Sequence, residues 1–188
     1  MFNIVENYFT TYDEFWNMKN NTDEKLEYID GLVLMSPSPS IPHQRISGNL
    51  YFALRSFFKD KKCDVFSAPT DIELVKDDSK NLVIPDLSVI CDKSGFTNNR
   101  YIGIPNLIIE ILSPSNQSHD LVTKMDLYMR YGVREYWIVN PMKKSLTVYS
   151  MDETGGYEQY CVRNEIGKVE SKIFTELEID MEEIFLDV

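Results

Sequence analysis

Three charged residues lie in apolar surroundings, and together their side chains could carry out metal-assisted hydrolysis. Glu110 stands within the run NLIIEIL, and Asp86 stands within LVIPDLSVI. Lys124 lies between Leu121 and Tyr128 on the apolar stripe of a predicted helix, where a base is equally out of place. Burying a charge is unfavourable unless the group is paired, neutralised or bound to a cation. Two acids and one base on neighbouring elements would form a cluster whose charges compensate one another.

The chemistry that such a cluster supports is phosphodiester hydrolysis. Magnesium prefers oxygen ligands and keeps several of its waters, so one or two carboxylates are sufficient to hold it. A Mg²⁺ or Mn²⁺ ion held by Asp86 and Glu110 would polarise a phosphate and activate a water molecule. Lys124 would orient that water or stabilise the negative charge that develops during the reaction.

Each of these residues also has an interpretation without chemistry. Glu110 could lie at a solvated strand end, and Asp86 follows Pro85 and could begin a turn. Lys124 could extend its ammonium group to solvent, or it could pair with Asp120 at the i, i+4 spacing of a helix salt bridge. The coincidence of all three on two strands and the next helix favours a common site.

Hydrophobic periodicity, caps and turn signals predict the elements that must position these residues. Helices are predicted at Thr11–Asn20, His43–Lys59 and Ser118–Tyr131, with a helical turn at Met181–Phe185. Strands are predicted at Leu26–Ile29, Leu32–Met35, Val65–Ser67, Asp71–Leu74, Leu82–Ile90, Asn106–Leu112, Glu135–Val139, Ser145–Tyr149, Tyr157–Arg163 and Lys168–Phe174. The Asp30-Gly31 pair between the first two strands is typical of a two-residue hairpin turn.

The order of these elements predicts an α/β fold. The strand–helix–strand run over residues 106–139 indicates a crossover that joins two strands of a mixed sheet. We expect this mixed β-sheet to be flanked by helices, with an N-terminal helix and hairpin and with antiparallel strands at the C-terminus. The chain of 188 residues has no internal repeat, and its length fits one domain over residues 1–188.

The net charge of −11 argues against a nucleic-acid partner, because an acidic surface repels phosphates. The excess of acidic residues is distributed unevenly along the chain. Residues 151–188 hold 11 acids and 3 bases, whereas residues 1–150 carry a net charge of −3. The larger part of the chain is therefore near neutral, although it presents no basic patch.

Cysteine usage and hydropathy indicate an intracellular protein. Cys63, Cys91 and Cys161 are odd in number and widely spaced, which suggests neither a disulfide framework nor a thiolate metal site. No apolar run approaches the roughly 20 residues that span a bilayer. The acidic N-terminus lacks the basic region of a signal peptide. We therefore expect reduced thiols, no membrane partner and a cytoplasmic location.

Several short motifs occur along roughly residues 10–150. They are Pro85-Asp86, EILSPS from Glu110, Asp120-x-x-x-Lys124-x-x-x-Tyr128, GVREYW from Gly132, LEYIDG from Leu26, Met35-Ser36-Pro37, and His43 at the start of a helix. This combination resembles the Uma-two family of proteins described as restriction endonucleases, within the PD-(D/E)XK nuclease superfamily. The resemblance implies a restriction-endonuclease-like core.

The resemblance also implies roles for individual residues. Asp86 and Glu110 would bind the metal, and the backbone carbonyl of Ile111 would supply a further ligand. The superfamily pattern has a lysine two residues after the glutamate, where this chain has Leu112. The resemblance assigns the role of that lysine to Lys124, the residue that the helical periodicity selects independently.

Four further residues match family positions. Glu27 would be an accessory catalytic acid and His43 an occasional metal ligand, although Glu27 could equally be a solvated acid and His43 a loop or first-turn residue. Asp120 and Tyr128 would contact the metal ligands without binding the metal themselves, unless Asp120 is an ordinary helix charge.

Two functions follow from these observations. The first is an endonuclease that cleaves DNA phosphodiester bonds with Mg²⁺ or Mn²⁺, acting as a homodimer by analogy with other nucleases. The second is a non-catalytic binding or assembly module that keeps the nuclease fold. The acidic charge and the absence of a lysine at position 112 favour the second function.

Overall fold

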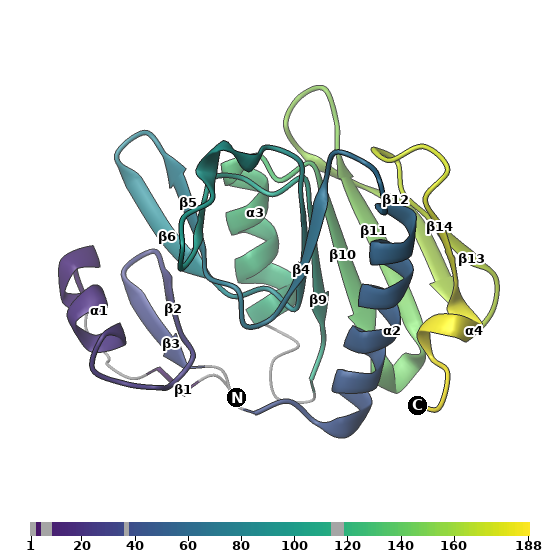
Figure 1. Cartoon of the computed structure of the whole chain (residues 1–188), viewed down its shortest axis with the longest axis horizontal. Helices are drawn as coiled ribbons and strands as arrows, with labels where there is room; N and C mark the ends of the chain where they lie inside the picture. Colours follow the sequence, from purple (N-terminus) through teal and green to yellow (C-terminus); the bar gives the residue numbers. More distant parts are fainter. Residues whose placement is uncertain (1–2, 5–8, 36–37, 114–118) are drawn as a thin grey trace.

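The computed structural model describes residues 3–4, 9–35, 38–113 and 119–188, with side chains over residues 9–35, 38–113 and 122–188. These residues form a mixed α/β fold (Figure 1). Within this described part, the strands make two six-stranded sheets and one two-stranded sheet. The predicted fold class, with its mixed sheet, N-terminal helix and hairpin, and C-terminal antiparallel strands, is confirmed.

The central sheet has the strand order β12-β11-β10-β9-β7-β4. Its strands are β4 Asp64–Ser67, β7 Leu87–Ile90, β9 Leu107–Ile111, β10 Glu135–Asn140, β11 Ser145–Met151 and β12 Tyr157–Asn164. The strands β9 and β10 are parallel, as the predicted crossover requires, whereas the other neighbours in this sheet are antiparallel.

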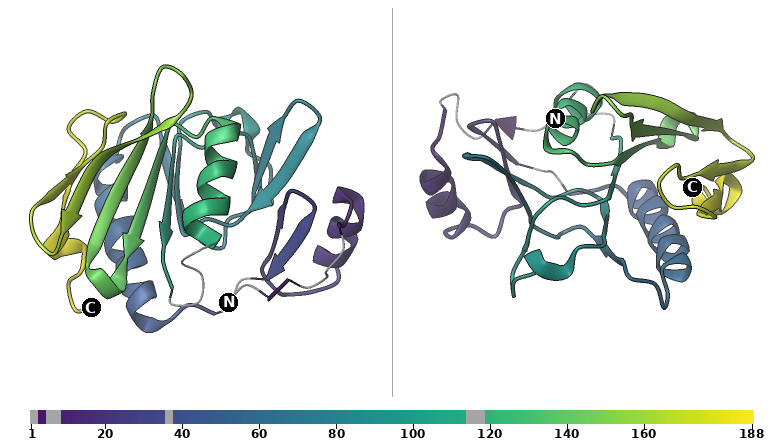
Figure 2. Two further views of the ribbon diagram at one scale, coloured as in Figure 1. Left: turned by 180° about the vertical axis from the view of Figure 1, so that it is seen from behind. Right: turned by 90° about the horizontal axis from the view of Figure 1, so that it is seen from above.

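Two helices cover opposite faces of the central sheet (Figure 2). The helix α2, Ile41–Phe57, packs on the face that carries Ile109. The helix α3, Met125–Tyr131, packs on the face that carries Ile108. Because β9 is covered on both faces, all five of its residues are buried, which explains its nearly continuous apolar sequence.

The second sheet has the order β1-β3-β2-β6-β5-β8. Its strands are β1 Asn3–Ile4, β2 Leu26–Ile29, β3 Leu32–Met35, β5 Ile72–Lys76, β6 Ser79–Val83 and β8 Tyr101–Ile102. The predicted hairpin is confirmed: Asp30 and Gly31 both have positive φ, of 49° and 87°. The helix α1, Tyr12–Lys19, precedes it, and Thr11 and Glu14 form a capping box at its start.

The predicted strand Leu82–Ile90 is wrong. It is divided into β6 and β7, which belong to different sheets. The division falls at Ile84–Asp86, because Pro85 has no N–H to contribute to a ladder and fixes its own φ. Asp86 therefore lies in the connection between the sheets and does not share a strand face with Ile84 and Ser88.

Several predicted boundaries shift in the remaining elements. The helix α2 begins two residues earlier than predicted, because Ser40 caps it and Pro42 fits its first turn. The predicted helix Ser118–Tyr131 opens as a π-helical segment η2, His119–Lys124, and then continues as α3. The predicted strand Lys168–Phe174 is shorter, as β13 Lys168–Glu170, and it pairs with β14 Glu178–Asp180 ahead of α4 Met181–Ile184.

The expectation of reduced cysteines is wrong for two of the three. Cys63 and Cys91 form a disulfide. The sequence separation of 28 residues conceals their proximity. The strands β4 and β7 pair with Asp64 opposite Ile90, so the residues just outside that pair meet at the edge of the ladder. Cys161 is a free, buried cysteine. The cysteines thus no longer support a reducing compartment.

Candidate active site

A buried ion cluster joins three of the predicted residues. The Nζ atom of Lys124 lies 2.9 Å from Oε1 of Glu110 and 3.1 Å from Oε1 of Glu27. The three side chains are 3%, 5% and 0% exposed, in the same order. Glu27 is therefore not a solvated acid, and Lys124 does not extend to solvent.

Three elements that are distant in the sequence supply this cluster. Glu27 comes from β2, Glu110 from the penultimate position of β9, and Lys124 from the last residue of η2. Lys124 reaches the cluster because the chain leaves β9 and returns as a helix on the adjacent face. Asp120 lies on the backbone of η2, but its side chain is outside the described residues.

Tyr128 completes the cluster from α3, one helical turn after Lys124. Its hydroxyl donates a hydrogen bond of 2.7 Å to Oε1 of Glu110. Burial raises the pKa of Tyr128 well above its ordinary value, and the negative charges of Glu110 and Glu27 raise it further. The phenol therefore stays protonated and remains a hydrogen-bond donor to the carboxylate.

Asp86 and His43 form a second, more accessible pair. The Oδ2 atom of Asp86 accepts a hydrogen bond of 2.8 Å from the backbone N–H of Ile111, and it lies 3.2 Å from Nε2 of His43. The side chains of His43 and Asp86 are 14% and 19% exposed. His43 belongs to the first turn of α2, where its backbone N–H donates to the capping hydroxyl of Ser40.

Backbone contacts bring the ion cluster and the Asp86 pair together. Ile111, which binds Asp86 through its N–H, directly follows Glu110 in β9. On the other side, Oε1 of Glu27 accepts a hydrogen bond of 2.8 Å from the N–H of Ile84, two residues before Asp86. The break at Pro85 thus places Asp86 against the carboxyl end of β9. Open α/β sheets commonly bind ligands at such strand ends.

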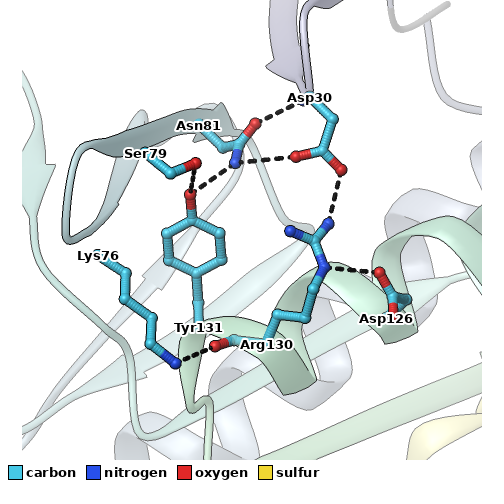
Figure 3. A network of polar contacts seen from close by, with 7 residues as sticks. All are labelled: Asp30, Lys76, Ser79, Asn81, Asp126, Arg130 and Tyr131. Atoms are coloured by element: carbon cyan, nitrogen blue, oxygen red, sulfur yellow. Dashed lines mark hydrogen bonds and ion pairs between the residues drawn. The ribbon is translucent and has the colours of Figure 1, made fainter.

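A polar network holds the β2–β3 hairpin, and hence Glu27, against the helix that carries Lys124 (Figure 3). Arg130 of α3 donates to Oδ2 of Asp30 at 2.6 Å and to Oδ2 of Asp126 at 2.7 Å. Asn81 of β6 accepts from the N–H of Asp30 and donates to the hydroxyl of Tyr131. Of these residues the sequence singled out only Asp30, as part of the hairpin turn, although Asp126 and Arg130 have the i, i+4 spacing of a helix ion pair.

The chemistry of the side chains suits a hard divalent cation. Among the described residues, no group of three or more His, Cys, Asp or Glu side chains is gathered closely enough to hold a metal. The set of His43, Asp86 and Glu110 is therefore not assembled as one ligand group. Magnesium, however, is held by one or two carboxylates and keeps its waters. Asp86, Glu110, Glu27 and Lys124 have a formal balance of −2, which a divalent ion would offset.

The mixed α/β fold thus places Lys124 between the buried carboxylates of Glu27 and Glu110. The chain belongs to the Uma2 family, described as "Putative restriction endonuclease", whose model matches residues 12–182. This membership supports a nuclease-type function and a nucleic acid as the substrate class.

Similar proteins agree with the family and the fold. A crystal structure of a "putative nuclease belonging to DUF820" from Anabaena variabilis has a TM-score of 0.74 and 21% identity, covering 92% of this chain and 96% of that chain. Two uncharacterized proteins of a Synechocystis strain are also similar. The protein slr1290 is 26% identical over 77% of this chain and 76% of its own length. The protein sll1609 is 28% identical over 69% and 74%.

None of the helices within the described ranges is long and apolar enough to cross a membrane.

Proposed function

We propose that this chain is an endonuclease that hydrolyses DNA phosphodiester bonds with Mg²⁺ or Mn²⁺. The observation that carries the proposal is the buried contact of Lys124 with Glu110 and Glu27, held beside Asp86 by the backbone of Ile84 and Ile111. Burying one base between two acids in the centre of a small protein brings little net stability. Such an arrangement is better explained by chemistry.

Each residue has a role in this proposal. Asp86 and Glu110, with His43 and the carbonyl of Ile111 as further candidates, would hold the metal, which polarises the phosphate and activates a water. Lys124 would stabilise the developing charge on the phosphate or orient the attacking water. Glu27 acts as the accessory acid that orients the ammonium group of Lys124. Tyr128 supports the carboxylate of Glu110 by donating its hydroxyl hydrogen.

Cleavage assays on plasmid and single-stranded DNA with Mn²⁺ test the assignment. We expect Asp86→Asn, Glu110→Gln and Lys124→Met each to lower the cleavage rate by about a hundredfold or more. The matched control is Lys168→Ala, because Lys168 forms a lysine–glutamate pair with Glu178 on the exposed surface. Cleavage that persists in all three site variants would exclude this site as the catalytic centre.

A non-catalytic binding or assembly module is the second candidate function. The net charge of −11 favours it, because it opposes the approach of DNA. Calorimetric titration with MnCl₂ separates the two functions. Metal binding that is lost in Glu110→Gln and kept in Glu135→Gln, a buried acid outside the site, supports the enzyme. Absence of metal binding together with absence of cleavage supports the module.

Three further proposals concern organisation. Residues 1–188 form one domain, two copies act as a homodimer because duplex cleavage needs two cuts, and the protein acts in the cytoplasm where DNA is found. Light scattering at several concentrations tests the dimer.

The Cys63–Cys91 disulfide is unusual for a reducing compartment. Alkylation before and after reduction, on protein taken directly from cells, therefore tests the location.

A further inference from the structure

A cleft of 660 Å³ lies beside the C-terminal end of α1, outside the residues assigned to catalysis. Its lining includes Trp16, Lys19, Lys25, Pro69, Ile84 and Arg100. These residues come from α1, the segment that leads into β2, the connection before β5, the β6–β7 break and the loop before β8. The cleft is thus built from several elements and is not the surface of one loop.

Trp16 and Arg100 form a cation–π pair in this cleft. The guanidinium carbon of Arg100 lies 4.7 Å from the centre of the Trp16 ring. A buried carboxylate holds the Arg100 side chain in place. The Nε atom of Arg100 donates a hydrogen bond of 2.7 Å to Oε2 of Glu73, whose side chain is 6% exposed. The Arg100 side chain itself is 32% exposed. Indole and guanidinium planes are the groups on which proteins stack nucleobases.

The cleft is contiguous with the proposed catalytic centre along two stretches of backbone. Ile84 lines the cleft and gives its N–H to Glu27. Pro69 also lines the cleft, and the preceding residue, Ala68, donates its N–H at 2.9 Å to the backbone carbonyl of Asp86. A nucleotide chain whose phosphate reached Asp86 would therefore lie next to residues that adjoin the cleft.

The charges of the cleft indicate which part of a nucleotide it would hold. Three cationic and three acidic side chains line it, so the cleft is formally neutral. Lys19 is already paired with Asp71 at 3.1 Å. A neutral site attracts phosphate weakly, whereas stacking on an aromatic ring does not depend on net charge. The lining therefore favours a base over a phosphate.

We propose that this cleft binds an unstacked nucleobase of the strand that is cut, with the Trp16–Arg100 pair as the stacking surface. The proposal rests on the proposed nuclease function for its substrate. It adds a binding subsite that positions the strand at Asp86, and it is compatible with the acidic charge of the chain because stacking supplies the affinity.

Tryptophan fluorescence tests the proposal without any cleavage. The chain has two tryptophans, and Trp137 is fully buried, so quenching by an added base reports on Trp16. Full-length protein is titrated with oligothymidylate and with an abasic phosphodiester oligomer of equal charge, in the absence of metal. We expect quenching by oligothymidylate alone. In Trp16→Ala, checked for folding by circular dichroism, the affinity for dye-labelled oligothymidylate, measured by fluorescence anisotropy, should fall by about tenfold or more.

Arg100→Ala should weaken oligothymidylate binding roughly tenfold, a change of about 1.4 kcal/mol. The matched control is Lys61→Ala, because Lys61 forms a separate cation–π pair with Phe57 at 3.2 Å; it should leave binding unchanged. Equal quenching by the abasic oligomer, or no quenching at millimolar oligothymidylate, overturns the subsite. Because no metal or turnover is involved, quenching in a protein that never cleaves DNA would reject the nuclease proposal and keep the subsite.

Discussion

Two buried glutamates on neighbouring parallel strands have opposite surroundings. Within the described part of the chain, Glu110 of β9 accepts hydrogen bonds from two side chains, the ammonium of Lys124 and the phenol of Tyr128. Glu135 of β10 accepts from the indole of Trp137 at 2.7 Å and from the backbone N–H groups of residues 172 and 173 at 2.8 and 3.1 Å. Glu110 lies near the carboxyl end of its strand, and Glu135 begins its strand.

The difference separates a structural carboxylate from one suited to chemistry. Backbone N–H groups keep their place as long as the fold persists, so Glu135 fastens the segment after β13 to the central sheet. Side-chain donors can move or exchange, so Glu110 can give a lone pair to a metal ion without breaking the fold. Burial alone does not identify a catalytic acid. The kind of hydrogen-bond donor that compensates the buried carboxylate distinguishes a catalytic acid from a structural one.

The largest expected effect comes from removing the cation of the Glu110 cluster. Lys124→Met should lower the free energy of unfolding by about 3–5 kcal/mol, because it removes the buried ammonium group that contacts both Glu27 and Glu110. Urea unfolding followed by circular dichroism measures the change. Adding Glu110→Gln to Lys124→Met should recover part of the loss. A loss below about 1 kcal/mol would contradict a buried ion cluster that depends on the ammonium group of Lys124.

Removing the structural carboxylate should have the next largest effect. Glu135→Ala leaves the indole of Trp137 and two backbone N–H groups without their acceptor, and we expect a loss of about 3 kcal/mol. The affinity for Mn²⁺, measured by calorimetry, should be the same as in the unchanged protein. Weaker Mn²⁺ binding in the folded variant would contradict the separation of the two glutamates.

A smaller change tests the phenol that supports Glu110. Tyr128→Phe removes one buried hydrogen bond to a carboxylate, and the free energy of unfolding should fall by about 1–2 kcal/mol. Thermal and urea unfolding measure this loss. Cleavage should fall less than in Glu110→Gln, because the carboxylate remains. A variant as inactive as Glu110→Gln would place Tyr128 in direct contact with the substrate.

The smallest expected effect is a pH dependence specific to Glu135. Burial raises the pKa of Glu135 above its ordinary value, and the hydrogen bonds that it accepts lower it only in part. The folded state thus holds this proton to higher pH than the unfolded state does. Its contribution to stability is present below the unfolded pKa and is lost as pH rises through the folded pKa.

Unfolding free energies at a series of pH values check this dependence. The difference between Glu135→Gln and the unchanged protein should shift in favour of the glutamine variant as pH rises from about 4 to 8, since glutamine never ionises. A difference that stays constant across this range would show that folding does not perturb the carboxyl group.

Local sequence determined most of the elements and part of the site. The Asp30-Gly31 turn depends on near neighbours, so its pattern predicted it correctly. The capping box at Thr11 and Glu14 and the left-handed Gly132 that ends α3 are equally local features of the structure. The helical periodicity also predicted that Lys124 faces the core, and Lys124 is buried. Each of these features depends on residues within one or two turns of chain.

Only the tertiary structure decided which partners those residues meet. Sequence patterns could not show that Pro85 sends β6 and β7 into different sheets or that Cys63 meets Cys91 across a ladder. Likewise, Glu110 and Glu135 both read as acids in apolar strands. The donors to Glu110 come from η2 and α3, and those to Glu135 come from Trp137 and residues 172–173. The packing of these segments on the sheet, and not strand periodicity, made Glu110 a candidate ligand and Glu135 a structural carboxylate.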